Sequence, residues 1–283
     1  MEIPLDVINI IASYIVKHPM KLLDWIDKEK LDWTGLSRNP NAIDMLENNL
    51  DKIERNGLSC NPNAIHILEA NPKKISWSSL SANPNAIHIL EANPDKIFPA
   101  NIIENPNAIH LLDGIYNKLI EEYSNFGNMD DDTDGDEIYW GKLSKNPNAM
   151  DLLEDNKDSI YWEYLSANPN AMDLLEANQD SIYWEYLSAN PNGMDLLEAN
   201  PDKIKWDHLS ANPNAIHILE ANTNKISWKG LSKNPNAIHL LKSNQAKISW
   251  WNISENPSIF EPDTKQINKN VLIRAMILDP IIN

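Results

Sequence analysis

One phrase, Asn-Pro-Asn-Ala-Ile-His-Ile-Leu-Glu-Ala-Asn-Pro, recurs along most of this 283-residue chain. Complete or related copies start at Asn39, Asn61, Asn83, Asn105, Asn146, Asn168, Asn190, Asn212, Asn234 and, in weaker form, Asn256. Most neighbouring copies lie 22 residues apart. A fixed period of this length is typical of solenoid proteins, in which each unit packs only on its neighbours.

The phrase itself predicts a short α-helix. The side-chain oxygen of its first Asn can accept hydrogen bonds from backbone N–H groups at the start of the helix. Pro fits the first turn because its nitrogen carries no hydrogen that would need a partner there. Ile87 and Leu90 fall on one helical face, which we expect to be buried. Asn93 suits a left-handed C-terminal position and Pro94 ends the helix. A helix of roughly eight to ten residues cannot persist alone, so neighbouring repeats must support it.

The second half of the repeat, with Ile75, Trp77 and Leu80, has neither a strand period nor a long helical one. We interpret it as a bend followed by one or two turns of α or 3₁₀ helix. The alternative is a leucine-rich repeat with a short strand at Ile-Ser-Trp, but the Asn-Pro pair falls in the wrong place for it. The prediction is therefore all-α: an α-solenoid of 22-residue repeats, each a short α-helix plus a short α/3₁₀ helix. Ten units about 9 Å apart would give a rod or arc about 90 Å long.

Breaks in the period divide the chain into five parts. Residues 1–17 predict an N-terminal capping helix, 18–112 the first run of repeats, 113–137 an acidic insertion, 138–257 the second run, and 258–283 a C-terminal cap. The terminal helices are expected to cover the open ends of the stack. The copies at Asn105 and Asn146 lie 41 residues apart, so the insertion interrupts one repeat. Because insertions in repeat proteins often lie on the binding face, we expect 113–137 to contact a partner.

Composition narrows the class of protein. The formal net charge is −17 and the isoelectric point about 4.7, which disfavours binding to nucleic acid or to anionic membranes. Cys60 is the only cysteine, so no internal disulfide is possible and a reducing compartment is expected. The N-terminus has no basic cluster followed by an apolar core, so no signal peptide is predicted. We expect a soluble intracellular protein.

Tryptophans recur at one position of nearly every repeat. A ladder of this kind is expected to form the packing unit between repeats rather than a ligand site, because short helices make a thin core and an aromatic ring buries much area. Besides Trp33, the ladder contains Trp77, Trp140, Trp162, Trp184, Trp206, Trp228 and Trp250.

A second row alternates between His and Asp on one face of the predicted helices. Successive helices are about 8–10 Å apart, so these residues are expected to form an exposed polar stripe rather than a metal site. The stripe is a candidate partner contact, with His as a pH-sensitive element. It contains His66, His88, His110, Asp151, Asp173, Asp195, His217 and His239.

The insertion contains Asp130, Asp132 and Asp134, spaced as at the start of an EF-hand calcium loop. The place of the closing Glu holds Gly141, so we expect a solvated acidic loop, with calcium binding as the alternative. The sequence contains no phosphate-binding glycine loop, no His-Glu-x-x-His and no Gly-x-Ser-x-Gly. We therefore expect no enzymatic activity and no cofactor.

Two resemblances follow from these residues. The repeated phrase with its Trp and Leu-Ser resembles short repeats in proteins of giant, nucleocytoplasmic large DNA viruses. This implies a protein of the infected host cytoplasm or of the virion. Residues 3–16 resemble the first helix of an F-box, which implies docking to a ubiquitin ligase. The leading hypothesis is a non-enzymatic scaffold for protein–protein interaction with a partner not identified by sequence. The alternatives are a virion structural component and an F-box-like adaptor, and the repeat makes no prediction of oligomeric state.

Overall fold

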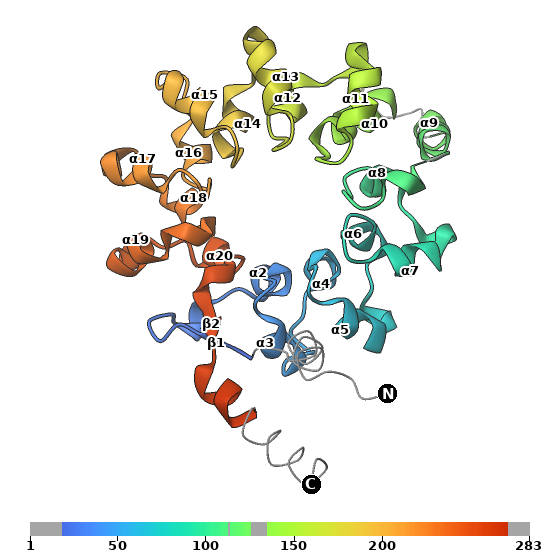
Figure 1. Ribbon diagram of the computed structural model, residues 1–283. Coiled ribbons are helices and arrows are strands. Elements are labelled where there is room, and N and C mark those ends of the chain that lie inside the picture. Colours follow the sequence, from blue (N-terminus) through green and yellow to red (C-terminus); the bar gives the residue numbers. More distant parts are fainter. Residues whose placement is uncertain (1–18, 113, 126–134, 271–283) are drawn as a thin grey trace, which may run out of the picture.

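The computed structural model describes residues 19–112, 114–125 and 135–270, and there the repeats form a closed ring (Figure 1). Each repeat supplies one helix next to the central opening and, in most repeats, a second helix on the outside. We call these the inner and outer helices. The predicted all-α solenoid of short α and 3₁₀ helices is confirmed, and the leucine-rich alternative is wrong because helices begin at the Trp positions.

Ten inner helices border the opening. They are α2 (Trp33–Arg38), α4 (Arg55–Cys60), α6 (Trp77–Ser81), α8 (Pro99–Ile102), α10 (Gly135–Lys145), α12 (Trp162–Leu165), α14 (Trp184–Ala189), α16 (Trp206–Leu209), α18 (Trp228–Lys233) and α20 (Trp250–Ile253).

The outer elements carry the Asn-Pro-Asn-Ala phrase. They are α3 (Ile43–Glu47), α5 (Ile65–Ala70), α7 (Ile87–Glu91), the 3₁₀ turn η4 (Ile109–Leu111), α11 (Met150–Asp155), α13 (Met172–Ala177), α15 (Met194–Ala199), α17 (Ile216–Ala221) and α19 (Ile238–Ser243). Further 3₁₀ turns are η1 (Lys28–Lys30), η2 (Pro72–Lys74), η3 (Pro94–Lys96), η5 (Lys157–Ser159), η6 (Gln179–Ser181), η7 (Thr223–Lys225), η8 (Pro235–Ala237), η9 (Gln245–Lys247) and η10 (Pro257–Ile259).

The core is one continuous layer between the inner and outer helices. In each repeat an inner-helix aliphatic residue such as Leu80, and the outer Ala86 and Leu90, are fully buried. The short helices thus contribute only a few apolar side chains each. Burial by both neighbours, rather than intrinsic helix propensity, stabilises them.

A ladder of buried asparagines joins the repeats. At Asn61, Nδ2 donates to the carbonyl oxygens of Ser37 at 3.0 Å and Asn39 at 2.9 Å, and Oδ1 accepts the Asn63 N–H at 3.0 Å. These bonds satisfy main-chain groups that the turn would otherwise leave buried and unpaired. The same set recurs at ten residues, the Asn ladder, each at most 1% exposed: Asn39, Asn61, Asn83, Asn105, Asn146, Asn168, Asn190, Asn212, Asn234 and Asn256.

A serine two residues before nine of the ten ladder asparagines forms a second link. Ser210 Oγ donates to the carbonyl of Trp206 at 2.7 Å and accepts the N–H of Ser227, in the next repeat, at 2.9 Å. Nine serines accept such an N–H: Ser37, Ser59, Ser81, Ser144, Ser166, Ser188, Ser210, Ser232 and Ser254. The tenth position holds Ile103, next to the insertion.

The last repeat bonds to the first repeat in the way that each repeat bonds to the one after it. Asn39 Nδ2 donates to the carbonyls of Ser254 at 3.0 Å and Asn256 at 2.9 Å, and the Asp32 N–H donates to Ser254 Oγ at 2.8 Å. The Asn39 bonds reproduce the Asn link found between all other neighbours, and the Ser254 bond reproduces the Ser link found at every other junction except the one at Ile103. We call this junction the seam.

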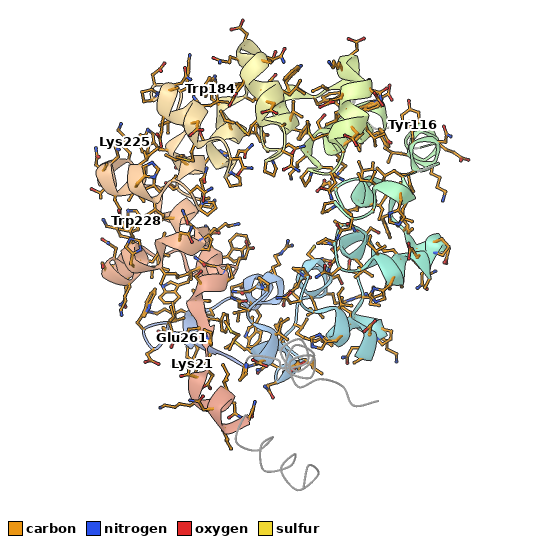
Figure 2. All side chains as sticks on the ribbon, viewed as in Figure 1. Lys21, Tyr116, Trp184, Lys225, Trp228 and Glu261 are labelled. Atoms are coloured by element: carbon orange, nitrogen blue, oxygen red, sulfur yellow. The ribbon has the colours of Figure 1, made fainter. Side chains whose placement is uncertain are left out.

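A two-stranded sheet completes the seam. Strand β1 (Met20–Leu22) pairs antiparallel with β2 (Phe260–Pro262), and the Leu23 N–H donates to the Ile259 carbonyl at 2.9 Å. Lys21 lies opposite Glu261, with Nζ 2.9 Å from Oε1 (Figure 2). Segments from opposite ends of the chain therefore build one outer element.

The solenoid is closed rather than the expected rod or arc, because the first and last repeats meet at the seam. Ten inner helices about 9 Å apart give a circle of helix axes about 29 Å across. Allowing about 5 Å for the outer radius of each helix leaves an opening of about 19 Å. The described side chains leave the centre open (Figure 2).

The structure describes only part of the expected terminal caps. The predicted N-terminal helix 1–17, with its F-box resemblance, lies outside the described residues. In the predicted cap 258–283, η10 and β2 belong to the seam, and residues 264–270 are helical.

The insertion adds helix α9 (Ile115–Asn125) on the outer side of the ring, packed against both α8 and α10 (Figure 1). Leu119 is fully buried in this packing, and Tyr116 Oη donates to Asp136 Oδ1 at 2.6 Å. Asn146 still reaches the carbonyls of Ile103 at 2.7 Å and Asn105 at 3.2 Å. The insertion therefore leaves the Asn ladder intact.

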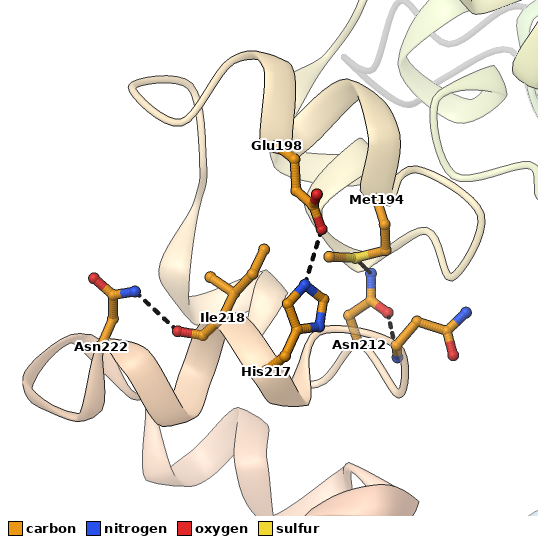
Figure 3. A network of polar contacts seen from close by, with 7 residues as sticks. Met194, Glu198, Asn212, His217, Ile218 and Asn222 are labelled. Carbon is orange, nitrogen blue, oxygen red and sulfur yellow. Dashed lines mark hydrogen bonds and ion pairs between the residues drawn. The ribbon is translucent and has the colours of Figure 1, made fainter.

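The helix-ending asparagines behave differently from the expectation. Asn93 has φ −138°, so the predicted left-handed conformation is wrong. Its Nδ2 instead donates to the carbonyl of Ile89, four residues earlier, at 2.8 Å. Asn222 makes the same bond to Ile218 at 2.9 Å (Figure 3). A side-chain amide thus caps the last turn without a positive φ.

Candidate functional site

Each residue of the Trp ladder is the first residue of its inner helix, except Trp140, which lies within α10. Trp77, Trp140, Trp162, Trp184, Trp206, Trp228 and Trp250, together with Trp33, are half-buried and pack against the core. Each Trp therefore has one side in the layer between repeats and another that solvent can reach.

Lysines of the chain lie over several of these rings. In each case the ammonium belongs to the following repeat, 19 residues after the Trp or across the seam, and lies within the range of a cation–π contact. The distances from Nζ to ring centre are 5.0 Å for Lys52 and Trp33, 4.4 Å for Lys225 and Trp206, 4.5 Å for Lys247 and Trp228, and 5.1 Å for Lys30 and Trp250.

The predicted His/Asp stripe lies on the outer helices. Each histidine pairs with a glutamate of the preceding repeat, as His217 does with Glu198 at 2.8 Å (Figure 3). The other pairs are His66 with Glu47 at 2.8 Å, His88 with Glu69 at 3.0 Å, His110 with Glu91 at 3.1 Å and His239 with Glu220 at 2.8 Å. These pairs are exposed, so each contributes little to stability.

At Asp173 and Asp195 the residue 19 positions earlier is again a glutamate, so two acids stand where other repeats have a His–Glu pair. Asp151 begins this part of the stripe. Residues 158–202 contain nine acidic side chains and neither Lys nor Arg. We call this sector, which covers α12 to α15, the acidic arc.

The stripe does not converge on a metal ion. Among the residues that the structure describes, no group of three or more His, Cys, Asp or Glu side chains could hold one. The candidate calcium ligands Asp130, Asp132 and Asp134 lie outside the described residues. A role of the stripe in partner contact stays a prediction.

The exposed positions of the inner helices are polar and differ around the ring. Glu185 Oε1 lies 3.0 Å from His208 Nε2 in the next repeat. A hydrogen bond to Glu163, helped by that residue's negative charge, raises the pKa of Tyr186 to about 12. The rings of Tyr164 and Tyr186 lie 6.4 Å apart. The acidic arc thus extends to the helices that border the opening.

The insertion, expected to contact a partner, is itself packed on the ring. Tyr116 and Tyr139 meet edge to face with ring centres 5.1 Å apart, and burial raises the pKa of Tyr139. Lys142 of α10 forms an ion pair with Glu104, which follows α8, so the repeats on the two sides of the insertion also contact each other directly. For α9 the Tyr116 contact indicates a structural role. Residues 126–134 of the insertion lie outside the described residues.

Comparison with known proteins adds no identity: no family profile, curated protein or solved structure matches the chain. In the described part of the chain, no helix has the length and apolar character needed to cross a bilayer.

Sequence reasoning missed the lysine row. Its signal was present, because Lys30, Lys52, Lys74, Lys96, Lys203, Lys225 and Lys247 each precede the aliphatic residue that opens the second half of a repeat. What the sequence alone does not show is that four of these lysines, Lys30, Lys52, Lys225 and Lys247, reach back to the Trp of the repeat before them.

Proposed function

We propose that this chain is a non-enzymatic ring-shaped scaffold that binds a protein partner through its inner helices. One observation carries the proposal: the frame of the repeat is nearly uniform, whereas residues on the inner helices vary. The two residues after the Trp position read, around the ring, Thr-Gly, Asn-Gly, Ser-Ser, Ala-Asn, Gly-Lys, Glu-Tyr, Glu-Tyr, Asp-His, Lys-Gly and Trp-Asn.

The outer helices lack this variety. Their Asn, Ala and Leu positions are buried and almost constant, and their exposed positions alternate mainly between His and Asp. Structural requirements are the same in every repeat, so they predict equal residues at equal positions. Some of the varying inner positions, such as Gly35, are buried, but Glu185, Asp207 and Trp251 are exposed. Variation at the exposed positions supports recognition of a particular, non-repeating partner surface.

The chemistry of this face suits a protein. Exposed Trp251, Tyr164 and Tyr183 offer large apolar area beside charged groups, a combination enriched at protein interfaces. The formal charge of −17 disfavours nucleic acid as the partner. The lack of catalytic sequence motifs supports a binding role rather than an enzymatic one.

Affinity purification with matched charge variants tests the proposal. The inner variant is Glu185→Lys with Asp207→Lys. The outer variant is Asp173→Lys with Asp195→Lys, which makes the same charge change in the same sector. All four side chains are exposed.

Tagged wild type and both variants would be expressed in cells, and co-purifying proteins quantified by mass spectrometry. The expected result is a partner retained by wild type and the outer variant and depleted with the inner variant. Identical recovery from all three, or selective loss with the outer variant, would contradict binding through the inner helices.

A further inference from the structure

The lysine row is interrupted at one place in the ring. Going round the ring, the position that precedes the conserved aliphatic residue holds Lys in seven repeats, but Glu137, Ser159 and Ser181 in three consecutive ones. The two serines stand where a lysine would lie over Trp140 and Trp162, which are 19 residues earlier. In the part of the chain that the structure describes, no lysine ammonium lies over either ring.

Six repeats combine this lysine with a Trp at the position it can reach, and in four of them the ammonium lies over the ring. In the other two, Lys96 and Lys203 pair instead with the preceding Asp95 and Asp202. In the repeat where Arg55 replaces Trp, the corresponding Lys74 turns away and its Nζ donates to the carbonyl of Leu50 at 2.7 Å. Where the ring is present and covered, as at Trp206 and Trp228, the ammonium lies 4.4 and 4.5 Å from its centre. Four of the chain's own repeats therefore show that this face of the Trp ring accepts an ammonium group.

Trp140 and Trp162, the two ladder tryptophans for which the chain has a serine in place of this lysine, stand at the acidic arc. Asp158 and Asp180 directly precede Ser159 and Ser181 in the same 3₁₀ turns, and Glu163 follows Trp162. In repeats with a lysine, its positive charge offsets such acids. Here both the ring and the neighbouring carboxylates lack the cation that the equivalent sites have.

We propose that Trp140 and Trp162 receive Lys or Arg side chains of the protein partner, in place of the lysines that the chain supplies elsewhere. This inference rests on the proposed scaffold function and names the chemistry of its partner. Indole is the aromatic ring that attracts cations best, and nearby carboxylates strengthen the attraction to a positive charge.

The geometry also sets the spacing in the partner. Neighbouring repeats are about 9 Å apart, and an extended chain rises about 3.3 Å per residue. Basic residues three positions apart in an extended segment are therefore about 10 Å apart and match two successive rings. The occupant is an extended protein segment with the pattern Lys-x-x-Lys, or its arginine equivalent.

The first measurement uses a peptide in which single lysines are separated by pairs of glycines, titrated into the full chain. Binding is followed by the indole N–H signals in nuclear magnetic resonance spectra. The signals of Trp140 and Trp162 are expected to shift, whereas those of Trp206 and Trp228, already covered, are expected to stay. Equal shifts at all four rings would overturn the assignment.

The decisive variant supplies the missing lysines. Ser159→Lys with Ser181→Lys restores the residue found in seven other repeats, so folding is expected to be retained. Peptide affinity should fall about fivefold to thirtyfold, the range for two lost cation–π contacts.

A charge control distinguishes ring covering from simple repulsion. Ala177→Lys with Gln179→Lys adds the same two charges at exposed positions of the arc, and Lys157, which is equivalent to Gln179, contacts no ring among the described residues. A fall in affinity as large as that of the serine variant would refute the role of the rings. An equal response of the two rings to spermine would overturn the commitment to a protein segment.

Failure of this inference is separable from failure of the proposed function. A partner captured equally by wild type and by the Ser159→Lys/Ser181→Lys variant would refute the tryptophan sites and leave the scaffold standing. The scaffold proposal itself would be refuted only if the Glu185→Lys/Asp207→Lys variant retained every protein captured by wild type.

Discussion

The seam makes a quantitative prediction for Asn39→Ala. In an open solenoid the first ladder asparagine would have no preceding repeat, and only its local bond to the Asn41 N–H, at 2.9 Å, would be lost. In the ring, its Nδ2 also bonds the carbonyls of Ser254 and Asn256, and the side chain is 0% exposed.

The size of the effect follows from these three bonds. Removing a buried partner costs about 1–1.5 kcal/mol per hydrogen bond, because the remaining carbonyl or N–H stays buried and unpaired. We expect Asn39→Ala to lower the free energy of unfolding by about 3–4 kcal/mol in the ring, against about 1 kcal/mol in an open chain. Asn212→Ala removes the same set inside the ring, with bonds of 3.1, 2.8 and 2.9 Å, so it should cost about as much.

Urea unfolding of the two variants in parallel provides the assay. Asn41→Ala and Asn214→Ala are matched controls, since each loses one bond at a more exposed residue, to Pro257 at 3.0 Å and to Pro191 at 2.7 Å. If Asn39→Ala behaved like its control while Asn212→Ala lost the full 3–4 kcal/mol, the seam would not form in solution and the ring would be refuted.

Three further predictions follow from single contacts. Lys21→Cys with Glu261→Cys, in a background without Cys60, should form a disulfide between β1 and β2. The disulfide would be visible as a mobility change on a non-reducing gel. Because it closes a very long loop, it is expected to raise the free energy of unfolding by up to about 5 kcal/mol. Trp184→Ala should lower the free energy of unfolding by about 2–3 kcal/mol, less than for a fully buried ring because Trp184 is half-buried, and an unchanged melting temperature would disprove its packing role. In a titration followed by tyrosinate absorbance, Tyr186 should ionise near pH 12, and Glu163→Gln should return its pKa towards the usual value of about 10. Because the folded-state pKa is the higher one, the stability from this bond is present below about pH 10 and lost as the pH rises to about 12.

The local structure of a repeat could be predicted from its residues because the same physics recurs in each copy. The Asn-Pro pair, the apolar Ala86 and Leu90 and the Trp at the start of the inner helix each have a strong positional preference. The left-handed conformation expected at Asn93 was wrong, because an Asn amide can also cap a helix by donating to the carbonyl four residues earlier.

The candidate site was less accessible to sequence reasoning. The sequence alone shows which residues occupy the same position in successive repeats, and this is enough to identify the His/Asp stripe. Which rows face each other depends on how one repeat is placed on the next. The structure shows that Lys225 reaches Trp206 and that His217 reaches Glu198, both across a step of 19 residues. Once that step is known, Ser159 and Ser181 stand out as the exceptions.

Ring closure depends on a small angle added many times. Ten equal steps complete a circle only if each turns the chain by about 36°, and an error of a few degrees per step would accumulate into an open superhelix. Propensities and periodicity fix which groups bond between neighbours, but not that angle. What selects the closed form is the chain's own ends: Ser254 and Asn256 present to Asn39 the same carbonyls that every other ladder asparagine finds, and β1 and β2 then pair over the junction. The contacts at the seam therefore decide whether the ring is closed, and Asn39→Ala tests them directly.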